Sequence, residues 1–439
     1  MPFVLPTLPS RPLSPTHSYT VNWTGGITQS LSVGDTIYLS NIDHPGDPYW
    51  GPFFWNNGGS PAISLDSGSV PPYDRSTLNN AGIVWASSTL YSTTAISLGT
   101  VNNSGWIIAE AAPTLEAATH GYASGTSAYG VLGANGVTNS GTIYAYATGA
   151  ALAVTLNGMA NLDNSGTIAA VAVQNPHGQG SWAYGVLTWQ PLVHITNQAG
   201  AQIVAQGGSA TAIEMLQGAI ELGGSGIVNH GLIEAVATGL NGRETAILVG
   251  VIFEWEHNEI VNDGTIRGSI AIEAADRAGY NLPIIGFDVP STQIVHNLTG
   301  GLIDGDILLH LGDDWVTNAG TIIGTVDLGP GDDLFDGQGG HVDGVVFLGG
   351  GSDQFLGGSQ NDVAVGGGGV TEMVGGNGAD LLVGDGNYDF WGGSLGNDDY
   401  LEGGAGNDGL YGGGGKDWLI TRDGDVAMAG DGDDVITTD

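Results

Sequence analysis

The sequence predicts an all-β protein, a right-handed parallel β-helix, and two internal repeats carry this prediction. The first repeat fills the middle of the chain, where Asn, one or two small residues and Gly are followed two residues later by Ile, as in Asn139-Ser-Gly-Thr-Ile143. The second fills the C-terminal quarter with a nine-residue phrase, of which 375–383 is the cleanest copy. Repetition at a fixed period is typical of solenoids, in which each coil buries its apolar face against the next.

Residues 1–17 form a proline-rich arm. Five prolines fall within the first 16 residues, which favours an extended polyproline-type segment without regular structure of its own. Such an arm is either a free tail or lies on a neighbouring molecule, and we favour the second interpretation.

Residues 18–75 combine short alternating apolar runs with a loop dense in aromatic side chains. These aromatic residues are Tyr49, Trp50, Phe53, Phe54 and Trp55. Aromatic residues at this density either cap the open end of a core or form a contact surface. We therefore predict an N-terminal β cap that can also serve as an interface.

Residues 76–327 contain the Asn-Gly-Ile phrase eight times. The repeated asparagines are Asn103, Asn139, Asn164, Asn197, Asn229, Asn262, Asn297 and Asn318, at steps of 21 to 36 residues. A coil of about 33 residues accommodates three short strands and three turns. We expect Asn, which tolerates a left-handed conformation, to hydrogen-bond the turn, Gly to form the corner, and both Asn and Ile to stack in ladders. The phrase is similar to the passenger domains of bacterial adhesins and autotransporters.

Residues 328–439 contain the nine-residue phrase and much of the charge, with 21 acidic and 2 basic residues. Glycines let the backbone turn through positive φ and bring carbonyl oxygens close together. The Asp at the sixth position adds an anionic oxygen, and Ca2+ takes six to eight oxygen ligands at about 2.3–2.6 Å. The segment therefore predicts calcium as its cofactor, bound in a step coupled to folding.

The phrase G-G-x-G-x-D-x-U-x resembles the calcium-binding repeat of the RTX family. This resemblance implies a C-terminal β-roll in which two nonapeptides form one turn and calcium lies between successive turns. The metal-binding candidates are Asp333, Asp353, Asp362, Asp380, Asp389, Asp398, Asp408, Asp417 and Asp434, with Gly375 and Asn377 of the cleanest copy.

Counting by nine assigns the acidic residues to two sides of the roll. One side is predicted to hold Asp362, Asp380, Asp398, Asp417 and Asp434. The other is predicted to hold Asp353, Thr371, Asp389, Asp408 and Asp425. Because Thr371 has no carboxylate and the turn of Asp425 lacks the glycine pattern, we expect more calcium on the first side.

Composition excludes several classes of function. The net charge is −38, from 45 acidic and 7 basic residues, which argues against binding nucleic acid or an anionic membrane surface. No apolar stretch of about 20 residues and no Sec-type leader is visible, so we expect no membrane insertion. The family resemblance implies an extracellular or cell-surface protein exported by type I secretion from a Gram-negative bacterium. The chain ends directly after its last repeat, which departs from the family pattern.

The sequence lacks HExxH, a nucleophile elbow, a P-loop and GxGxxG before a helix, so we expect no enzyme. Our leading hypothesis is a secreted, calcium-dependent structural protein that self-assembles into a surface layer or filament through the arm and the aromatic segment. The alternative is a monomeric adhesin or matrix protein that binds glycan or a cell surface. A polysaccharide lyase or epimerase is the third possibility.

Overall fold

The structure is a computed structural model that describes most of the repeat region. Besides four short strands between residues 21 and 64, the described ranges are 77–88, 92–97, 99–111, 126–157, 160–173, 180–188, 193–216, 225–239, 242–250, 257–275, 291–385 and 396–439. The predicted proline arm, the aromatic loop at 49–55 and Asp389 lie outside these residues.

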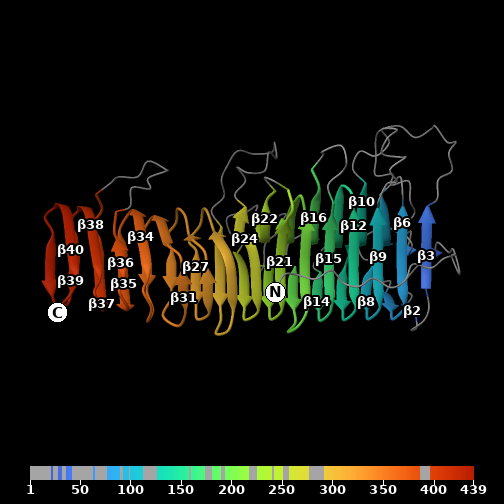
Figure 1. Ribbon diagram of the computed structural model, residues 1–439, viewed down its shortest axis with the longest axis horizontal. Coiled ribbons are helices and arrows are strands. Elements are labelled where there is room, and N and C mark those ends of the chain that lie inside the picture. Colours follow the sequence, from blue (N-terminus) through green and yellow to red (C-terminus); the bar gives the residue numbers. More distant parts are fainter. Residues whose placement is uncertain are drawn as a thin grey trace. The chain divides into compact units, whose positions relative to one another are not determined.

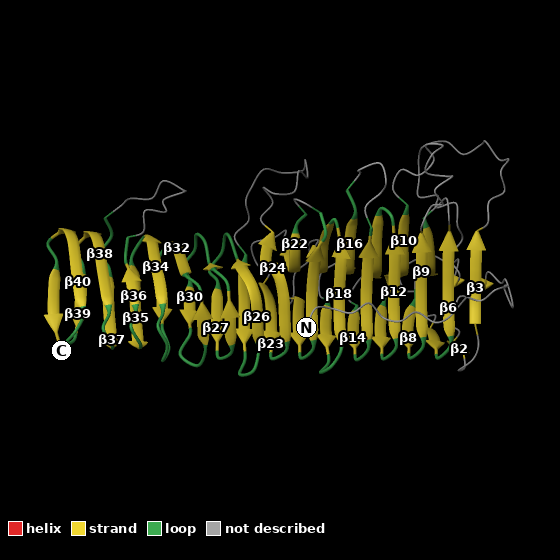
Figure 2. Ribbon diagram, viewed as in Figure 1, coloured by secondary structure: helices red, strands yellow, loops and turns green. Residues whose placement is uncertain are grey.

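Every regular element in the described ranges is a β-strand, and the paired strands run parallel (Figures 1 and 2). They form a sheet of 25 strands and a sheet of 16 strands, called here the 25-strand sheet and the 16-strand sheet. The predicted all-β class with stacked parallel strands is confirmed. The chain divides into two compact units, residues 1–216 with 231–246 and residues 217–230 with 247–439.

In the first unit each coil contributes one strand to the 16-strand sheet and two to the 25-strand sheet. Its strands in the 16-strand sheet are β2 (Thr28–Leu31), β5 (Thr77–Asn80), β8 (Thr100–Asn103), β11 (Gly136–Asn139), β14 (Asn161–Asn164) and β17 (His194–Asn197). The second row is β3 (Thr36–Asn41), β6 (Ile83–Ser88), β9 (Trp106–Ala111), β12 (Thr142–Ala147), β15 (Thr167–Ala172), β18 (Gln202–Gly207) and β21 (Leu232–Ala237). The third row is β1 (Val21–Asn22), β4 (Ile63–Ser64), β7 (Thr93–Ser97), β10 (Ser127–Ala134), β13 (Ala150–Leu156), β16 (Trp182–Thr188), β19 (Ser209–Leu216) and β22 (Glu244–Gly250). Three strands per coil were predicted, and this is confirmed.

The interior of the first unit is a ladder of stacked apolar side chains. Ile107, Ile143, Ile168 and Ile203 stand opposite one another in β9, β12, β15 and β18 and are fully buried. Neighbouring outward positions in the same strands are also buried, in a cluster that includes Trp85, Ile108 and Tyr144. The second row of strands is thus apolar on both sides, which explains its near-continuous hydrophobic sequence.

A second ladder consists of buried asparagines at the ends of the strands in the 16-strand sheet. In the first unit the amide Nδ2 of each Asn donates to the Oδ1 of the next at 2.7–2.9 Å, along Asn80, Asn103, Asn139, Asn164 and Asn197. The predicted stacking is confirmed, and so are the predicted bonds to the turn, as when Nδ2 of Asn103 donates to the carbonyl of Gly105 at 3.2 Å. The asparagines do not, however, take the left-handed conformation that they tolerate. Among the described residues only His310 combines a side chain with a positive φ. The Asn residues instead remain extended, because a buried amide must reach both neighbouring coils.

The glycines that follow Asn103, Asn139 and Asn164 are required by close packing of the corners. A Cβ at Gly141 would lie 2.1 Å from the carbonyl oxygen of Gly105 in the neighbouring coil. No side chain fits at that distance, so the corner accepts only glycine.

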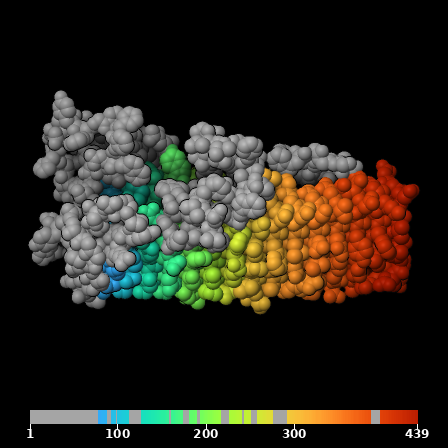
Figure 3. Space-filling view, turned by 180° about the vertical axis from the view of Figure 1, so that it is seen from behind, coloured from blue at the N-terminus to red at the C-terminus, as the bar shows by residue number. Residues whose placement is uncertain are grey.

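The second unit begins with the same ladder and then changes its coil. Its strands in the 16-strand sheet are β20 (Ser225–Asn229), β23 (His257–Asn262), β25 (Thr292–Asn297), β27 (Trp315–Asn318), β30 (Leu334–Asp336), β33 (Asp353–Leu356), β35 (Thr371–Asn377), β37 (Tyr400–Ala405), β39 (Trp418–Thr421) and β41 (Val435–Thr438). Its strands in the 25-strand sheet are β24 (Thr265–Ala275), β26 (Leu302–Leu308), β28 (Thr321–Ile323), β29 (Val326–Asp327), β31 (His341–Asp343), β32 (Val346–Gly350), β34 (Val363–Gly368), β36 (Leu381–Val383), β38 (Gly409–Gly415) and β40 (Val426–Gly432). From β33 onward a coil holds two strands instead of three, and the coils lie side by side as narrow bands (Figure 3).

Strand pairing continues through this change without interruption. β25 pairs with β27, β27 with β30, and β30 with β33, so the Asn-Gly coils lead directly into the nonapeptide coils. The inward side chains change from Val316 to Phe335 and Phe355, whose rings stack at 5.5 Å. The predicted continuation of the β-helix into a roll-like C-terminal part is therefore present within this unit.

Candidate metal centre

The C-terminal coils arrange acidic side chains in two columns, each at the corner where a strand begins. The first column, at the start of strands in the 16-strand sheet, contains Asp314, Asp333, Asp353, Thr371, Asp399, Asp417 and Asp434. The second column, at the start of strands in the 25-strand sheet, contains Asp362, Asp380, Asp408 and Asp425. Each coil from Asp314 onward adds one member to the first column, and the second column begins only with Asp362.

One carboxylate oxygen joins neighbouring coils in every column member except Thr371, which has no carboxylate, and Asp362, whose Oδ2 accepts the N–H of Gly358 at 2.8 Å. The backbone N–H of Asp314 donates to Oδ1 of Asp333 at 2.7 Å, and that of Asp333 donates to Oδ1 of Asp353 at 3.0 Å. In the second column the N–H of Asp380 donates to Oδ1 of Asp408 at 2.9 Å. Because a carboxylate has two oxygens, this bond leaves Oδ2 available for another partner.

The second oxygen is buried without a hydrogen bond in seven of these residues. They are Asp314, Asp333, Asp353, Asp380, Asp399, Asp408 and Asp417. A buried carboxylate oxygen that lacks a partner is costly, and the usual remedies are a proton or a bound cation. The columns consequently require one or the other.

Burial makes protonation easier along the first column. It raises the pKa of Asp314 to about 8, of Asp333 to about 9, and of Asp353 and Asp399 to about 7. Neighbouring carboxylates of the same column raise the pKa of Asp333 further. A divalent cation bound between these oxygens would reverse the shift, because it favours the charged form.

Glycine makes room for the free oxygen. A Cβ at Gly375 would lie 2.5 Å both from Oδ2 of Asp380 and from the carbonyl oxygen of Gly403 in the next coil. A Cβ at Gly412 would similarly lie 2.3 Å from Oδ2 of Asp417. The first glycine of the phrase thus keeps a carboxylate and a backbone carbonyl close together, whereas the side chain of Asn377 is exposed.

These donors suit a hard cation such as Ca2+, which binds carboxylate and carbonyl oxygens in flexible geometry. In the described part of the chain, no three His, Cys, Asp or Glu side chains converge in a way that could hold a metal ion. Backbone carbonyls would therefore have to supply most of the ligands of each ion, with one carboxylate from a coil. The glycine-rich corners provide such carbonyls.

The predicted assignment of residues to the two sides is wrong after Asp380. Asp408 belongs with Asp380, and Asp417 belongs with the column of Asp353. Thr371 and Asp399 are neighbours although 28 residues separate them, whereas Asp399 and Asp417 are 18 apart. Both columns have a step of 28 residues at this point instead of 18, so counting by nine slips by one strand.

The same slip makes the predicted ligand Asp398 an exposed residue. Asp399 is buried in its place, whereas Oδ1 of Asp398 accepts the N–H of Lys416 at the surface. Asp434 lies in the first column with Asp417 rather than with Asp362, and Asp425 extends the second column. Asp333, Asp353, Asp362, Asp380 and Asp408 are all column members as described above.

The candidate ligands predicted from the nonapeptides did not include Asp314 and Asp399. Asp314 lies before the nonapeptides, yet Gly312-Asp-Asp314 repeats in Gly331-Asp-Asp333 one coil later, and this match was the available signal. Neutral side chains precede Asp314 in the first column. In the coil before Asp314, the backbone N–H of Gln293 donates to Oδ1 of Asp314 at 2.7 Å. The side-chain Oε1 of Gln293 in turn accepts the amide of Asn258 at 3.0 Å.

The adjacent residues Asp398 and Asp399 provide a matched test of the columns. Asp399→Asn should weaken calcium binding by about tenfold or more, because ligand charge sets calcium affinity. Asp398→Asn, with the same charge change at the surface, should alter it less than about twofold. Calorimetric titration of both variants with calcium measures this difference. Equal losses of calcium affinity would contradict the assignment of Asp399, rather than Asp398, to the first column.

The raised pKa values also predict how pH affects the calcium-free chain. An unfolded Asp has a pKa of about 3.9, whereas Asp314, Asp333 and Asp399 in the folded coils have pKa values of about 8, 9 and 7. Between these limits the folded state binds more protons, so its stability falls as pH rises. Without calcium we expect order in these coils near pH 5 and loss of order toward pH 9. Circular dichroism with and without calcium measures this, and order that increases with pH in chelator would be the contrary result.

No family model, no curated protein and no solved structure matches this chain. Within the described residues we also find no helix with the length and hydropathy that a membrane crossing requires.

Proposed function

We propose that the chain is a secreted structural protein whose C-terminal coils fold when they bind calcium. The observation that carries this proposal is the set of seven buried Asp residues whose Oδ2 atoms have no partner. The resemblance of the nonapeptides to the RTX repeat supports the choice of calcium. Asp333, Asp353, Asp380, Asp399, Asp408 and Asp417 would hold the ions together with carbonyls of the glycine corners.

Calcium acts in this proposal as a folding switch. Without it, residues 328–439 carry 21 acidic and 2 basic side chains whose repulsion opposes the compact coil. The many glycines add a large entropic cost of ordering. Binding neutralises the columns, so binding free energy becomes folding free energy. A chain exported in low calcium would fold in a medium where calcium is millimolar.

We propose further that the folded chain self-assembles into a surface layer or filament and is not an enzyme. The stacked coils supply flat, repetitive faces, which suit repeated contacts between copies. Calcium added to millimolar concentration should raise light scattering of the chelator-treated chain, and electron microscopy should show ordered sheets or fibres that dissolve in chelator. A calcium-folded chain that stays monomeric at all concentrations would contradict assembly.

One observation favours the alternative of an adhesin that binds glycan. Trp418 is 51% exposed on the outer side of the 16-strand sheet and packs edge-on against Tyr400 at 6.1 Å. An exposed aromatic ring beside the carboxylate of Glu402, which Tyr400 contacts at 3.3 Å, is suited to stacking on a sugar. Loss of glycan binding in Trp418→Ala, with retention in Trp182→Ala, would support this role.

A further inference from the structure

The outer side of the 25-strand sheet is apolar over the last coils. The fragments 363–365, 381–383, 409–411 and 426–428 lie in register in β34, β36, β38 and β40. The central residues of the first three fragments, Ala364, Leu382 and Leu410, are buried in the interior, so the flanking residues point outward. We call the following residues the apolar face: Val365, Leu381, Val383, Tyr411, Val426 and Met428.

The apolar face is exposed and carries no charge. Met428 is 58% exposed, Val426 54% and Leu381 38%. The four fragments read Val-Ala-Val, Leu-Leu-Val, Gly-Leu-Tyr and Val-Ala-Met, so the Tyr411 hydroxyl is their only polar side-chain group. Outward positions of a solvated parallel sheet ordinarily hold polar residues, and a contiguous apolar patch marks a contact surface.

The outer side of the 16-strand sheet differs over the same coils. There Gln354, Glu372, Tyr400 and Trp418 follow one another in adjacent strands, and Glu402 lies in the next outward row. Carboxylates thus interrupt the apolar residues on that side. The contrast means that the uncharged surface is specific to one side and does not follow from the repeat itself.

The net charge of the chain restricts which partner can bind the apolar face. With a net charge of −38, two copies repel each other wherever their acidic surfaces meet. They can approach where neither copy has a charge, and the apolar face is such a place. A second copy also presents the same rows at the same spacing of about 4.8 Å between strands, so side chains of two facing sheets can interdigitate about 10 Å apart.

We propose that the apolar face binds the same face of a second copy, in a two-fold symmetric contact. The inference rests on the proposed function, because calcium must order β34 to β40 before the face exists. Its partner is another calcium-loaded chain. In a layer or filament this contact would join chains laterally.

The size of the face predicts a weak contact. Apolar patches of this kind reach about 300–600 Å2, whereas a stable dimer buries about 800 Å2 on each partner. We therefore expect dimers of the isolated chain only at about micromolar concentration or above. In an assembly, additional contacts on each chain would strengthen the association through avidity.

Single cysteines test the geometry directly, because the natural chain has none. Leu381→Cys places a thiol near the middle of the face, where a two-fold contact brings it close to its own copy. A disulfide needs Cβ atoms about 3.5–4.5 Å apart. Under mild oxidation in calcium we expect a cross-linked dimer of Leu381→Cys. The control Gln354→Cys, equally accessible on the opposite side, should remain monomeric.

Sedimentation gives a second, independent measurement. The natural chain in calcium should show a concentration-dependent mass, and Met428→Lys should lower its association at least tenfold. Val435→Lys, a matched change on the 16-strand sheet, should leave association unchanged. Circular dichroism confirms that each variant still folds with calcium.

The outcomes separate the two proposals. A chain whose coils are equally ordered with and without calcium overturns the proposed folding switch, and cross-linking of Leu381→Cys in such an ordered chain would still support the contact. A calcium-ordered chain that neither cross-links at Leu381→Cys nor self-associates overturns the contact alone. Binding of the apolar face to neutral lipid vesicles, lost in Met428→Lys, without self-association would also overturn it.

Discussion

Removal of calcium is expected to unfold the C-terminal coils that carry the carboxylate columns, while the coils of the first unit that carry the asparagine ladder remain folded. The carboxylate columns extend from Asp314 to Asp434, and seven of their buried Oδ2 atoms need a cation wherever the carboxyl group is not protonated. The asparagine ladder from Asn80 to Asn197 consists of neutral amides that satisfy one another. Of these two sets of stacked side chains, only the carboxylate columns therefore depend on an ion.

Hydrogen exchange measures this difference strand by strand. In chelator at neutral pH we expect amides of β33 to β41 to exchange at least about 100-fold faster, because local opening becomes nearly free. Amides of β11, β12, β14 and β15 should change by less than about threefold. Excess calcium should restore protection, and magnesium should not, because it demands a smaller octahedral site. Loss of protection in both groups of strands, or retention of protection in both, would contradict the expected difference between the C-terminal coils and the coils of the first unit.

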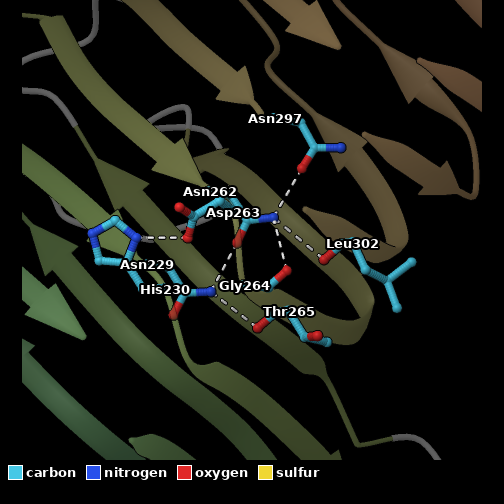
Figure 4. A network of polar contacts seen from close by, with 8 residues as sticks. All are labelled: Asn229, His230, Asn262, Asp263, Gly264, Thr265, Asn297 and Leu302. Carbon is cyan, nitrogen blue, oxygen red and sulfur yellow. Dashed lines mark hydrogen bonds and ion pairs between the residues drawn. The ribbon is translucent and has the colours of Figure 1, made fainter. Parts of the chain in front are cut away.

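The second large effect is expected from Asn262→Leu, which removes the centre of the ladder in the second unit (Figure 4). Oδ1 of Asn262 accepts the amide of Asn229 at 2.8 Å, and its Nδ2 donates to Oδ1 of Asn297 at 2.9 Å. Leucine has a similar size but leaves the donor of Asn229 with one bond fewer and Oδ1 of Asn297 without its ladder donor. At about 1–3 kcal/mol for each buried polar group left unsatisfied, the loss should be about 2–5 kcal/mol.

The neighbouring residue provides the control for this variant. Asp263 pairs with His230 at 2.6 Å between Oδ1 and Nδ1, and both side chains are partly exposed. Exposed pairs contribute about 0–1 kcal/mol, so Asp263→Asn should change stability by no more than that. Denaturant unfolding of both variants in calcium gives the comparison. If Asn262→Leu lowered the free energy of unfolding by less than about 1 kcal/mol, the asparagine ladder would not be a source of stability for the fold.

Repetition explains how much of this fold could be predicted from the sequence. Every coil meets nearly the same environment above and below it, so the same residue types recur at the same place in each coil. Ile143 and Asn139 were therefore recognisable as interior and ladder residues, and Asp380 as a column member. The extended conformation of the asparagines was not predictable, because it depends on an amide that bonds the neighbouring coils as well as its own turn.

The all-β class, the three-strand coil, the asparagine ladder and the acidic character of the C-terminal coils were all predictable from the repeated residues. Which acidic residues share a column became known from the folded coils, since strand pairing, and not residue count, sets the phase when residues are inserted. The tertiary structure placed Asp399 inside and Asp398 outside, and it added Asp314 to the first column. It also showed that Leu381 and Met428 share one uncharged face, because residues far apart in sequence become neighbours only when coils stack.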